Sequence, residues 1–312
     1  RGEPGIGKSC LADVLRAHVL AEGLRTVGAQ CQPENRNNAL TPFLNLLRQR
    51  LDAAPDTSPD GRRALVREIL RGAGCDEDAV LPIFCAWLSL PLGDCEPSRI
   101  SPPMQKALLL ASMAQWLLHM AESEPLLLVL EDMHWADPTS IEFVEQLSAQ
   151  LPRCRVLLVF TARPEWTPPQ GLEAECIDVR RLDDAQAAEL ARRALAPRAV
   201  TAGVIRNVVE RTDGVPLFVQ EMARMLLDAY LVESDGVWGF RDTVLPAAIP
   251  LTLRDSLVSR FDRIGPLKPL LQLAATMGRH FDFDLLCACL ERPQGEVGQE
   301  LAALGQAGLV IA

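Results

Sequence analysis

The glycine-rich stretch at residues 2–9, GEPGIGKS, constrains the fold of this chain more than any other feature. It fits the pattern G-x-x-x-x-G-K-[ST], in which a turn between a strand and a helix cradles phosphate groups. The glycines allow a tight turn whose backbone N–H groups converge on an anion. Lys8 can reach the β- and γ-phosphates, Ser9 can ligate Mg²⁺, and the following helix directs its positive dipole end at the phosphates. The pattern predicts a nucleotide site, and the alternative is a glycine-rich turn without a ligand.

The position of this pattern near the start of the chain leads to a second prediction, about the strand that normally precedes it. A buried strand normally precedes such a turn, and here only Arg1 precedes Gly2. We therefore expect a fragment that lacks its first strand. That strand should lie in the middle of the sheet, beside the strand ending at Glu131-Asp132. Its loss should uncover Val129 and Val159 and leave backbone groups unpaired, so we expect the fragment to be poorly stable.

Composition narrows the class of protein. With 312 residues, of which 48% are hydrophobic and 23% charged, the chain can form two or three globular domains. The net charge of −10 argues against a broad surface for nucleic acid or anionic membranes. Apolar runs stay shorter than the ~18 residues of a membrane span. The nine cysteines are scattered without a C-x-x-C pair, which favours buried reduced thiols of a cytoplasmic protein over metal or disulfide use.

Helical periodicity dominates the first part of the chain. It predicts a helix from Ser9 to about Glu22, with Leu11, Val14, Leu15 and Val19 on one face. A short strand is expected at Thr26–Cys31, followed by a polar loop to Pro42. Residues 42–123 then form a helical insertion, whose amphipathic stretches lie near 42–53, 61–72, 77–89 and 103–122. The insertion is either a partner-binding lid or a shield for the sheet.

Two five-residue apolar runs, Leu126–Leu130 and Val156–Phe160, predict parallel strands that are buried on both faces. Between them, Asp137-Pro138 has the residue types of a helix start, with Asp as the N-cap and Pro in the first turn. A third strand is expected at Glu175–Val179. This alternation of strands and helices predicts a doubly wound α/β layer.

Beyond residue 182 the pattern becomes mainly helical. Asp183 and Gln186 form a capping-box signal, and further helices are expected at 201–211 and 215–228. Tyr230–Glu233 and Val237–Phe240, joined by Ser-Asp-Gly, predict a small hairpin. A second capping signal, Thr252-x-x-Asp255, precedes an apolar stripe, and three short helices are expected within 266–308.

An acidic pair follows the first apolar strand. Glu131 and Asp132 stand where P-loop enzymes place the second half of their active site: one carboxylate holds the Mg²⁺ bound to Ser9, and the other orients or deprotonates the attacking water. Glu131 occupies the usual metal position and Asp132 the usual base position. The sequence leaves the directions of the two side chains open, and an ordinary solvated strand end is the alternative.

Four ordered motifs resemble one family. They are Gly2–Ser9, the EDMHWADP run at 131–138, the TARPEW run at 161–166, and the DGVPLF run at 213–218. Together they are similar to the AAA-type, signal-transducing STAND ATPase modules. In bacteria, such modules occur behind class III adenylate or guanylate cyclase domains, in some protein kinases and in large LuxR-family regulators. The resemblance spans nearly the whole chain.

The resemblance implies roles for particular residues. Gly2, Glu3, Pro4, Gly5, Ile6, Gly7, Lys8, Ser9 and Cys10 would bind the nucleotide, with Ser9, Glu131 and Asp132 around Mg²⁺. Arg163 stands where these proteins place a γ-phosphate sensor, and the alternative is a surface arginine. Pro216 resembles the proline that packs on the base or ribose, although a helix-initiating proline needs no ligand. For His134 and Trp135 we favour local packing over coupling to the next helix, and for Asp137 a helix cap.

The implied fold is α/β: a P-loop NTPase parallel sheet of AAA/STAND type with a helical insertion, followed by a small helical domain and a winged-helix-like domain. The corresponding boundaries are 1–182, with the insertion at 42–123, then 183–245 for a helical lid with a hairpin, then 246–312, where the winged helix would include His280. Direct DNA recognition by this last domain is disfavoured by the acidic charge.

The implied function is a switch that binds Mg·ATP, hydrolyses it slowly and signals to an effector domain in the same full-length chain, such as a cyclase, a kinase or a DNA-binding domain. A nucleotide-dependent oligomer fits this role. The alternatives are a nucleotide-binding adaptor without turnover, an efficient ATPase motor, and the ATPase part of a DNA-binding regulator.

Overall fold

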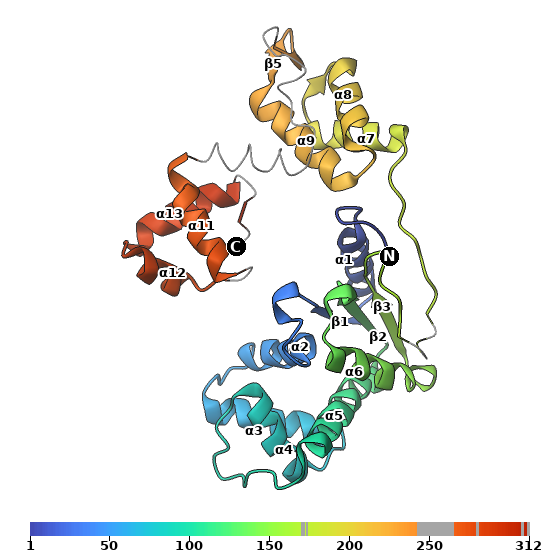
Figure 1. Cartoon of the computed structure of the whole chain (residues 1–312), viewed down its shortest axis with the longest axis vertical. Coiled ribbons are helices and arrows are strands. Elements are labelled where there is room, and N and C mark those ends of the chain that lie inside the picture. The colour runs from blue at the N-terminus through green and yellow to red at the C-terminus, as the bar shows by residue number, and fades with distance from the viewer. Residues whose placement is uncertain (170–171, 173, 242–264, 279–280, 307–308, 311–312) are drawn as a thin grey trace. The chain divides into compact units, whose positions relative to one another are not determined.

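The computed structural model describes residues 1–169, 172, 174–241, 265–278, 281–306 and 309–310 (Figure 1). The chain divides into two compact units, Arg1–Arg180 and Arg181–Ala312. Among the described residues, none of the helices is both long and apolar enough to cross a membrane. The division into three domains stays a prediction.

The first unit is an α/β structure around a parallel sheet. Its three strands are β1 (Arg25–Gln30), β2 (Leu126–Glu131) and β3 (Val156–Phe160), in the order β1-β2-β3. Val27 of β1 lies opposite Leu128 of β2, which in turn lies opposite Leu158 of β3. The three expected strands at 26–31, 126–130 and 156–160 are confirmed. This parallel α/β architecture is consistent with a P-loop NTPase.

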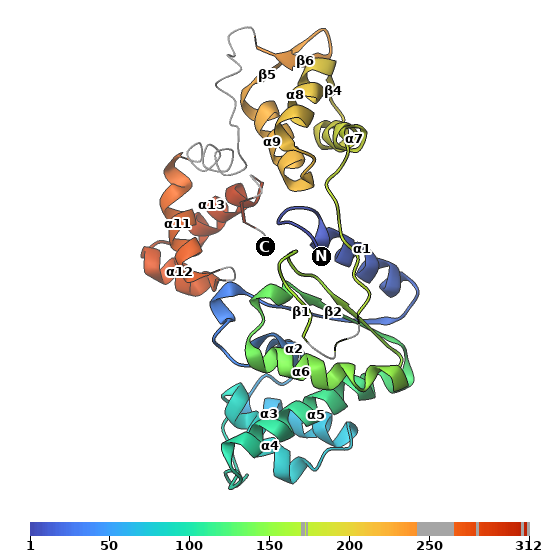
Figure 2. The same ribbon diagram turned by 45° about the vertical axis from the view of Figure 1, so that its right-hand side comes forward.

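Helices cover both faces of this sheet (Figure 2). On one face, α1 (Lys8–Ala21) packs Ala12 against Leu127 and Val129 of β2. On the other, α2 (Thr41–Asp52) and α6 (Pro138–Ser148) meet through the rings of Phe43 and Phe143, whose centroids are 4.4 Å apart. The alternation of β2 side chains between these faces fixes the direction of every residue along the strand.

The expected apolar face of α1 is wrong at two positions. Leu15 and Val19 pack against the sheet, but Leu11 and Val14 are 56% and 62% exposed. Each residue of an α-helix is rotated by about 100° from the one before it. The buried stripe is therefore centred on Ala12, Leu15 and Val19, and Leu11 and Val14 lie to the side of it.

The helical insertion is confirmed as four helices. Besides α2 these are α3 (Pro59–Gly72), α4 (Glu77–Leu88) and α5 (Pro102–Ser123), with Ser58 and Asp76 capping α3 and α4. A short 3₁₀ helix, η1 (Pro33–Asn35), lies in the preceding loop, and η3 (Leu151–Arg153) precedes β3. The buried face of the insertion continues the core that covers the sheet through Phe43, Phe84, Leu110 and Met113. The insertion is thus integral to the first unit.

Two strand expectations are wrong. Glu175–Val179 forms no strand, although the backbone N of Arg1 donates to Ile177 O (2.6 Å) and Val179 N donates to Arg1 O (2.8 Å). A strand preceding Gly2 cannot lie beside β2, because β1 and β3 already occupy both edges of β2. Gly2 N donates instead to Ala162 O (3.1 Å), just beyond β3. A strand leading into Gly2 would therefore adjoin β3.

Burial along the two apolar strands also differs. Every residue of β2 is buried, as expected for a strand covered on both faces. On β3, however, Leu157 is 57% exposed and the other residues are only partly buried. Since β3 is an edge strand of the described sheet, it has fewer neighbours to cover its side chains. The expectation of two-sided burial is wrong for β3.

The second unit begins with a helical layer and a small mixed sheet. Its helices are α7 (Asp184–Leu195), α8 (Ala202–Thr212) and α9 (Pro216–Ala229), and Asp183 and Gln186 form the expected capping box. The hairpin is confirmed as β5 (Leu231–Ser234) and β6 (Val237–Phe240), which are antiparallel. A two-residue strand, β4 (Ala199–Val200), pairs parallel with β6. So short a strand has no detectable sequence period.

The three helices expected within 266–308 are confirmed: α11 (Lys268–Met277), α12 (Phe283–Leu290) and α13 (Gln294–Gln306), preceded by η5 (Gly265–Leu267). They share a core of their own around Leu270, Leu286 and Val297. The Thr252–Asp255 capping signal and His280 lie outside the described residues. The winged-helix identity of this region stays a prediction.

The cysteines are less buried than expected. All nine are free thiols, and Cys31, Cys85 and Cys287 are buried. Three others, Cys10, Cys176 and Cys289, are exposed, so the interpretation as buried thiols is wrong for them.

Candidate nucleotide site

The turn at residues 2–7 is open at the point where it enters α1. Gly5 and Gly7 adopt positive φ angles of 76° and 101°, which residues with a Cβ rarely reach. Gly7 is the N-cap of α1, so no side chain caps the helix, and its first turn contains no acidic residue. Apart from Gly7 itself, its two chain neighbours and the adjoining helix backbone, no heavy atom of the described residues lies within 4 Å of a Cβ built on Gly7. This helix end therefore fits an anionic ligand such as a phosphate.

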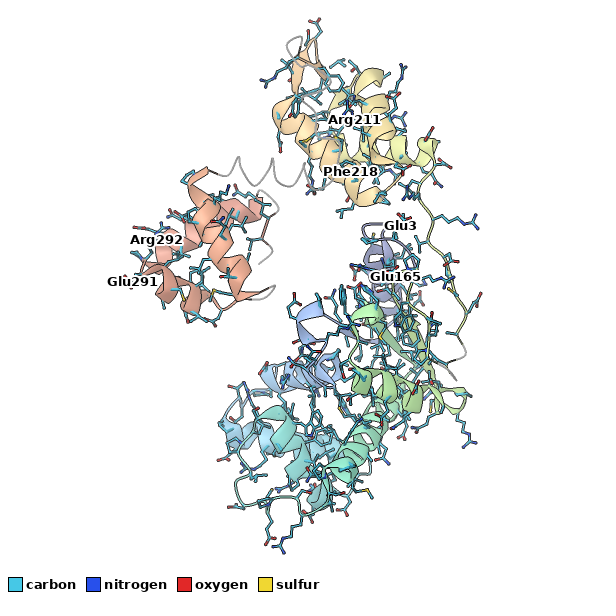
Figure 3. All side chains as sticks on the ribbon, in the orientation of Figure 1. Glu3, Glu165, Arg211, Phe218, Glu291 and Arg292 are labelled. Atoms are coloured by element: carbon cyan, nitrogen blue, oxygen red, sulfur yellow. The ribbon has the colours of Figure 1, made fainter. Side chains whose placement is uncertain are left out.

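Lys8 lies folded back over this turn. Its Nζ donates to the carbonyl oxygens of Gly2 (2.9 Å) and Glu3 (3.0 Å). Partial burial lowers the pKa of Lys8, and Asp132 makes the largest opposing contribution of any charged neighbour; Arg163 lowers the pKa and Glu165 raises it. Glu3 and Glu165 both lie beside the start of α1 (Figure 3). Residues from three separate motifs thus meet at Lys8.

Ser9 and Cys10, the next two predicted nucleotide-binding residues, are exposed in the first turn of α1. The Ser9 hydroxyl is therefore accessible to a metal ion bound beside the turn. Ile6 is buried, and a Cβ on Gly2 would come within 2.8 Å of its Cγ2, so a glycine at position 2 leaves room for this side chain. Pro4 is exposed.

Asp132 lies at the carboxyl end of β2 in a left-handed conformation, with φ at 58°. Its backbone N donates to Thr161 Oγ1 (3.0 Å), and its Oδ2 accepts from Gln30 Nε2 (3.0 Å). Gln30, the last residue of β1, and Thr161, the first residue after β3, therefore hold Asp132 in place together. In open parallel sheets, ligands bind at this carboxyl edge.

Glu131 faces a different environment. Its side chain continues the alternation of Leu127 and Val129 and lies on the α1 face of β2. Its Oε1 accepts from Arg16 Nη2 at 2.6 Å. The two adjacent carboxylates therefore have different surroundings. The sequence alone left the directions of their side chains open.

Arg163 packs on an aromatic ring. Its guanidinium carbon lies 5.3 Å from the ring centre of Trp135, which belongs to the 3₁₀ helix η2 (Met133–Trp135). The ring of His134 lies 5.0 Å from the same ring. Burial lowers the pKa of His134, while Asp132 raises it. The Nδ1 atom of His134 is buried without a hydrogen-bond partner among the described residues. The segments after β2 and β3 therefore converge beside Lys8.

Two further predicted residues have clear positions. Asp137 is confirmed as the N-cap of α6: its Oδ1 accepts from the backbone N of Thr139 (2.9 Å) and Ser140 (3.0 Å). Pro216 is the first residue of α9 in the second unit and follows Gly214, whose φ is 67°. A nucleotide contact of Pro216 stays a prediction.

Sequence reasoning missed Arg16, Gln30 and Thr161, all of which contact the acidic pair. Gly28, in the middle of β1, is the signal that points to Arg16. A Cβ on Gly28 would lie 2.9 Å from Arg16 Nη2, and a glycine inside a strand often marks a close approach. Gln30 could have been found as a polar residue at the carboxyl end of a strand.

A family model described as "AAA ATPase domain" matches residues 1–160 of the 312. The chain belongs to the AAA ATPase domain family. Membership implies P-loop NTPase activity, and AAA ATPases typically bind ATP with Mg²⁺. The open turn, Lys8 and the exposed Ser9 fit such a ligand.

Two other similarities extend beyond the AAA ATPase domain. A domain model of unknown function matches residues 183–236, which hold α7 to α9 and the start of the small sheet. An uncharacterized protein of Rhizobium meliloti (strain 1021) is 28% identical over 301 residues. That similarity covers 93% of this chain and 28% of the relative. The chain thus spans little more than a quarter of the relative's length.

Proposed function

We propose that this chain is an ATP-binding and slowly ATP-hydrolysing switch module of a larger regulator, converting Mg·ATP to ADP and phosphate. The observation that carries the proposal is the uncapped start of α1, where Lys8 lies folded over the turn and has Asp132 and Arg163 among its charged neighbours. One cation from the turn, one carboxylate and a second cation are the groups that phosphoryl transfer to water requires.

Each group has a definite task in this proposal. Lys8 exchanges its hydrogen bonds to Gly2 and Glu3 for the β- and γ-phosphate oxygens. A bound Mg²⁺, held at Ser9, would neutralise charge on the same oxygens. Asp132 accepts the proton of the attacking water, whose oxygen bonds to the γ-phosphorus as the bond to the β-phosphate oxygen breaks. Arg163 stabilises the charge that develops on the transferred group.

The regulatory part of the proposal rests on the resemblance to STAND modules. In it, the 183–245 region forms a lid that contacts the nucleotide through Pro216, and the 246–312 region clamps one nucleotide state. The effector is a cyclase, kinase or DNA-binding domain elsewhere in the full-length chain, and nucleotide state controls oligomerisation. We place the protein in the cytoplasm.

The test is Lys8→Ala in the full-length protein, assayed with a fluorescent ATP analogue and by phosphate release. We expect binding to be lost while the melting temperature is kept, because Lys8 makes hydrogen bonds only within the turn. Lys106→Ala, which removes a surface ion pair with Glu142, is the matched control. Unchanged ATP affinity in Lys8→Ala would refute the site. Tight nucleotide retention without phosphate release by the unmodified protein would identify an adaptor instead.

A further inference from the structure

We propose that Arg16 is a positioning residue that holds the Glu131 carboxylate on the α1 face of the sheet, leaving Asp132 as the carboxylate that acts at the nucleotide. This inference rests on the function proposed above and deepens it. It assigns a role to a residue outside the phosphate-binding motif and divides the acidic pair into a structural and a chemical member.

The first observation is the geometry of the ion pair. Arg16 Nη2 and Glu131 Oε1 are 2.6 Å apart, and the two side chains are 23% and 10% exposed. A short charge-assisted hydrogen bond shielded from water engages a carboxylate far more strongly than a surface pair does. Arg16 Nη1 also binds Asp13 Oδ1 at 2.7 Å, which fixes the guanidinium from a second side.

The second observation is the position of the pair along α1. Arg16 follows Ser9 by seven residues in an uninterrupted helix, which corresponds to about 10 Å along the axis. The backbone of Arg16 therefore lies two turns away from the helix end that would face the phosphates.

The third observation is the room made for Arg16 on the neighbouring strand. A Cβ on Gly28 would lie 2.9 Å from Arg16 Nη2 and 3.3 Å from its Cζ. The guanidinium crosses β1 at the one residue without a side chain and reaches Glu131 on β2. Gly28 thus serves this approach.

Asp132 differs from Glu131 in its hydrogen-bond partners and in its charged neighbours. Its hydrogen-bond partners among the described residues, Gln30 and Thr161, are neutral. It is the acid with the largest effect on Lys8. A carboxylate that retains its charge beside the phosphate-binding lysine can bind a metal-bound water or accept its proton.

The experiment compares single and double variants in the full-length protein. The two readouts are ATP turnover and the Mg²⁺ concentration that gives half-maximal binding of a fluorescent ATP analogue. Asp132→Asn should lower kcat by about 100-fold or more, whereas Glu131→Gln should lower it by less than about fivefold. Arg16→Met should lower kcat by about tenfold and shift the Mg²⁺ midpoint, because the released Glu131 carboxylate then competes for the ion.

Rescue separates positioning from general damage. Combining Arg16→Met with Glu131→Gln should recover most of the lost turnover and return the Mg²⁺ midpoint toward that of the unmodified protein, since the unpaired charge is gone. Gly28→Ala should shift the midpoint in the same direction as Arg16→Met, because it displaces the guanidinium without changing any charge. Arg25→Met is the control. Arg25 lies on β1, like Gly28, and its exposed ion pair with Glu124 is lost in this variant, which should leave both readouts unchanged.

Two results would overturn the inference: Glu131→Gln as slow as Asp132→Asn, or a double variant no better than Arg16→Met. If Arg16→Met does not fold, Gly28→Ala and Glu131→Gln still test the inference. An unchanged Mg²⁺ midpoint in Gly28→Ala would also contradict the inference. If only the inference about Arg16 is wrong, the Lys8→Ala variant will still fail to bind the ATP analogue. If the proposed function is wrong, the Lys8→Ala variant will still bind the ATP analogue.

Discussion

Adjacent residues at the end of a strand can have opposite surroundings, and Glu131 and Asp132 do. Glu131 still follows the alternation of β2 and faces α1, where Arg16 binds it. At Asp132 the chain leaves the strand with φ at 58°, and Thr161 Oγ1 accepts its backbone N–H. The sequence predicts both acids at the site. Their separation depends on a turn conformation and a distant hydrogen bond that no local pattern encodes.

The first residue-scale prediction concerns Asp132→Asn. We expect nucleotide binding to persist, because the amide keeps the shape of the side chain and can still accept from Gln30 Nε2. Hydrolysis should slow by about 100-fold or more, since the amide is a far weaker base. Equilibrium binding of a fluorescent ATP analogue together with single-turnover phosphate release will measure both. Equal turnover in variant and unmodified protein would require another base.

A second prediction uses two thiols. Burial raises the pKa of the Cys31 thiol to about 12, with Asp137 and Asp132 contributing, whereas Cys10 is exposed. Only the thiolate is alkylated, so iodoacetamide at pH 8 should modify Cys10 and spare Cys31, as mass spectrometry will show. Because the folded-state pKa of Cys31 is raised, its contribution to stability is present below about pH 9 and is lost as the pH rises toward 12. Rapid labelling of Cys31 in the folded protein would contradict this burial.

At the scale of elements, the helices were predictable and the sheet edge was not. Asp183 with Gln186 and Asp137 with Pro138 carry local capping chemistry, and both helices begin there. The pairing of Arg1 with residues 177–179, by contrast, joins segments at opposite ends of the unit. Whether an apolar run is buried on both faces depends on such distant neighbours, which is why β3 differs from the expectation.

The N-cap of α6 should be unusually important for stability. Besides capping α6, Asp137 Oδ1 accepts from the backbone N of the fully buried Leu40 (3.1 Å), whose φ is 59°. Asp137→Ala removes the cap and leaves that N–H without an acceptor, at a cost of about 2–4 kcal/mol. Asp137→Asn keeps one acceptor oxygen and should cost less. Urea denaturation will compare them, and equal midpoints for the Ala variant and unmodified protein would contradict the dual role.

Gly214, at the junction of α8 and α9, and Gly236, in the turn between β5 and β6, make a matched pair of glycines. Gly214 has a φ of 67°, and an added Cβ would come within 2.2 Å of Leu182 O, a backbone atom. Gly236 has a φ of 78°, and a Cβ added there would meet no heavy atom of the described residues within 4 Å, apart from those of its own chain neighbours. Gly236→Ala should cost about 1–2 kcal/mol from the backbone conformation alone, whereas Gly214→Ala adds overpacking of about 1–3 kcal/mol. Thermal unfolding of both variants tests this, and equal losses would mean that the Leu182 contact yields easily.

At the scale of the whole molecule, the sequence predicts the nucleotide site of the first unit better than any contact between the two compact units. The phosphate-binding turn and the acids after β2 are local motifs, and the AAA ATPase match covers the segment that contains them. Pro216 lies in a separate compact unit, beyond that match. A contact between residues of different units depends on how the units dock in each nucleotide state, and no motif within one unit specifies it.

Nucleotide binding should therefore reveal whether Pro216 belongs to the site. A ligand at 100 times its dissociation constant stabilises the state that binds it by about 2.7 kcal/mol, and it slows those local openings that disrupt its binding site. If Pro216 contacts the nucleotide, hydrogen exchange at the start of α9 should slow together with exchange at the start of α1 when Mg·ATP is added to the full-length protein. Lys8→Ala should abolish both effects, because it removes the ligand. Protection confined to the first unit would assign Pro216 a purely structural role as the first residue of α9, since a proline there needs no ligand to be favourable.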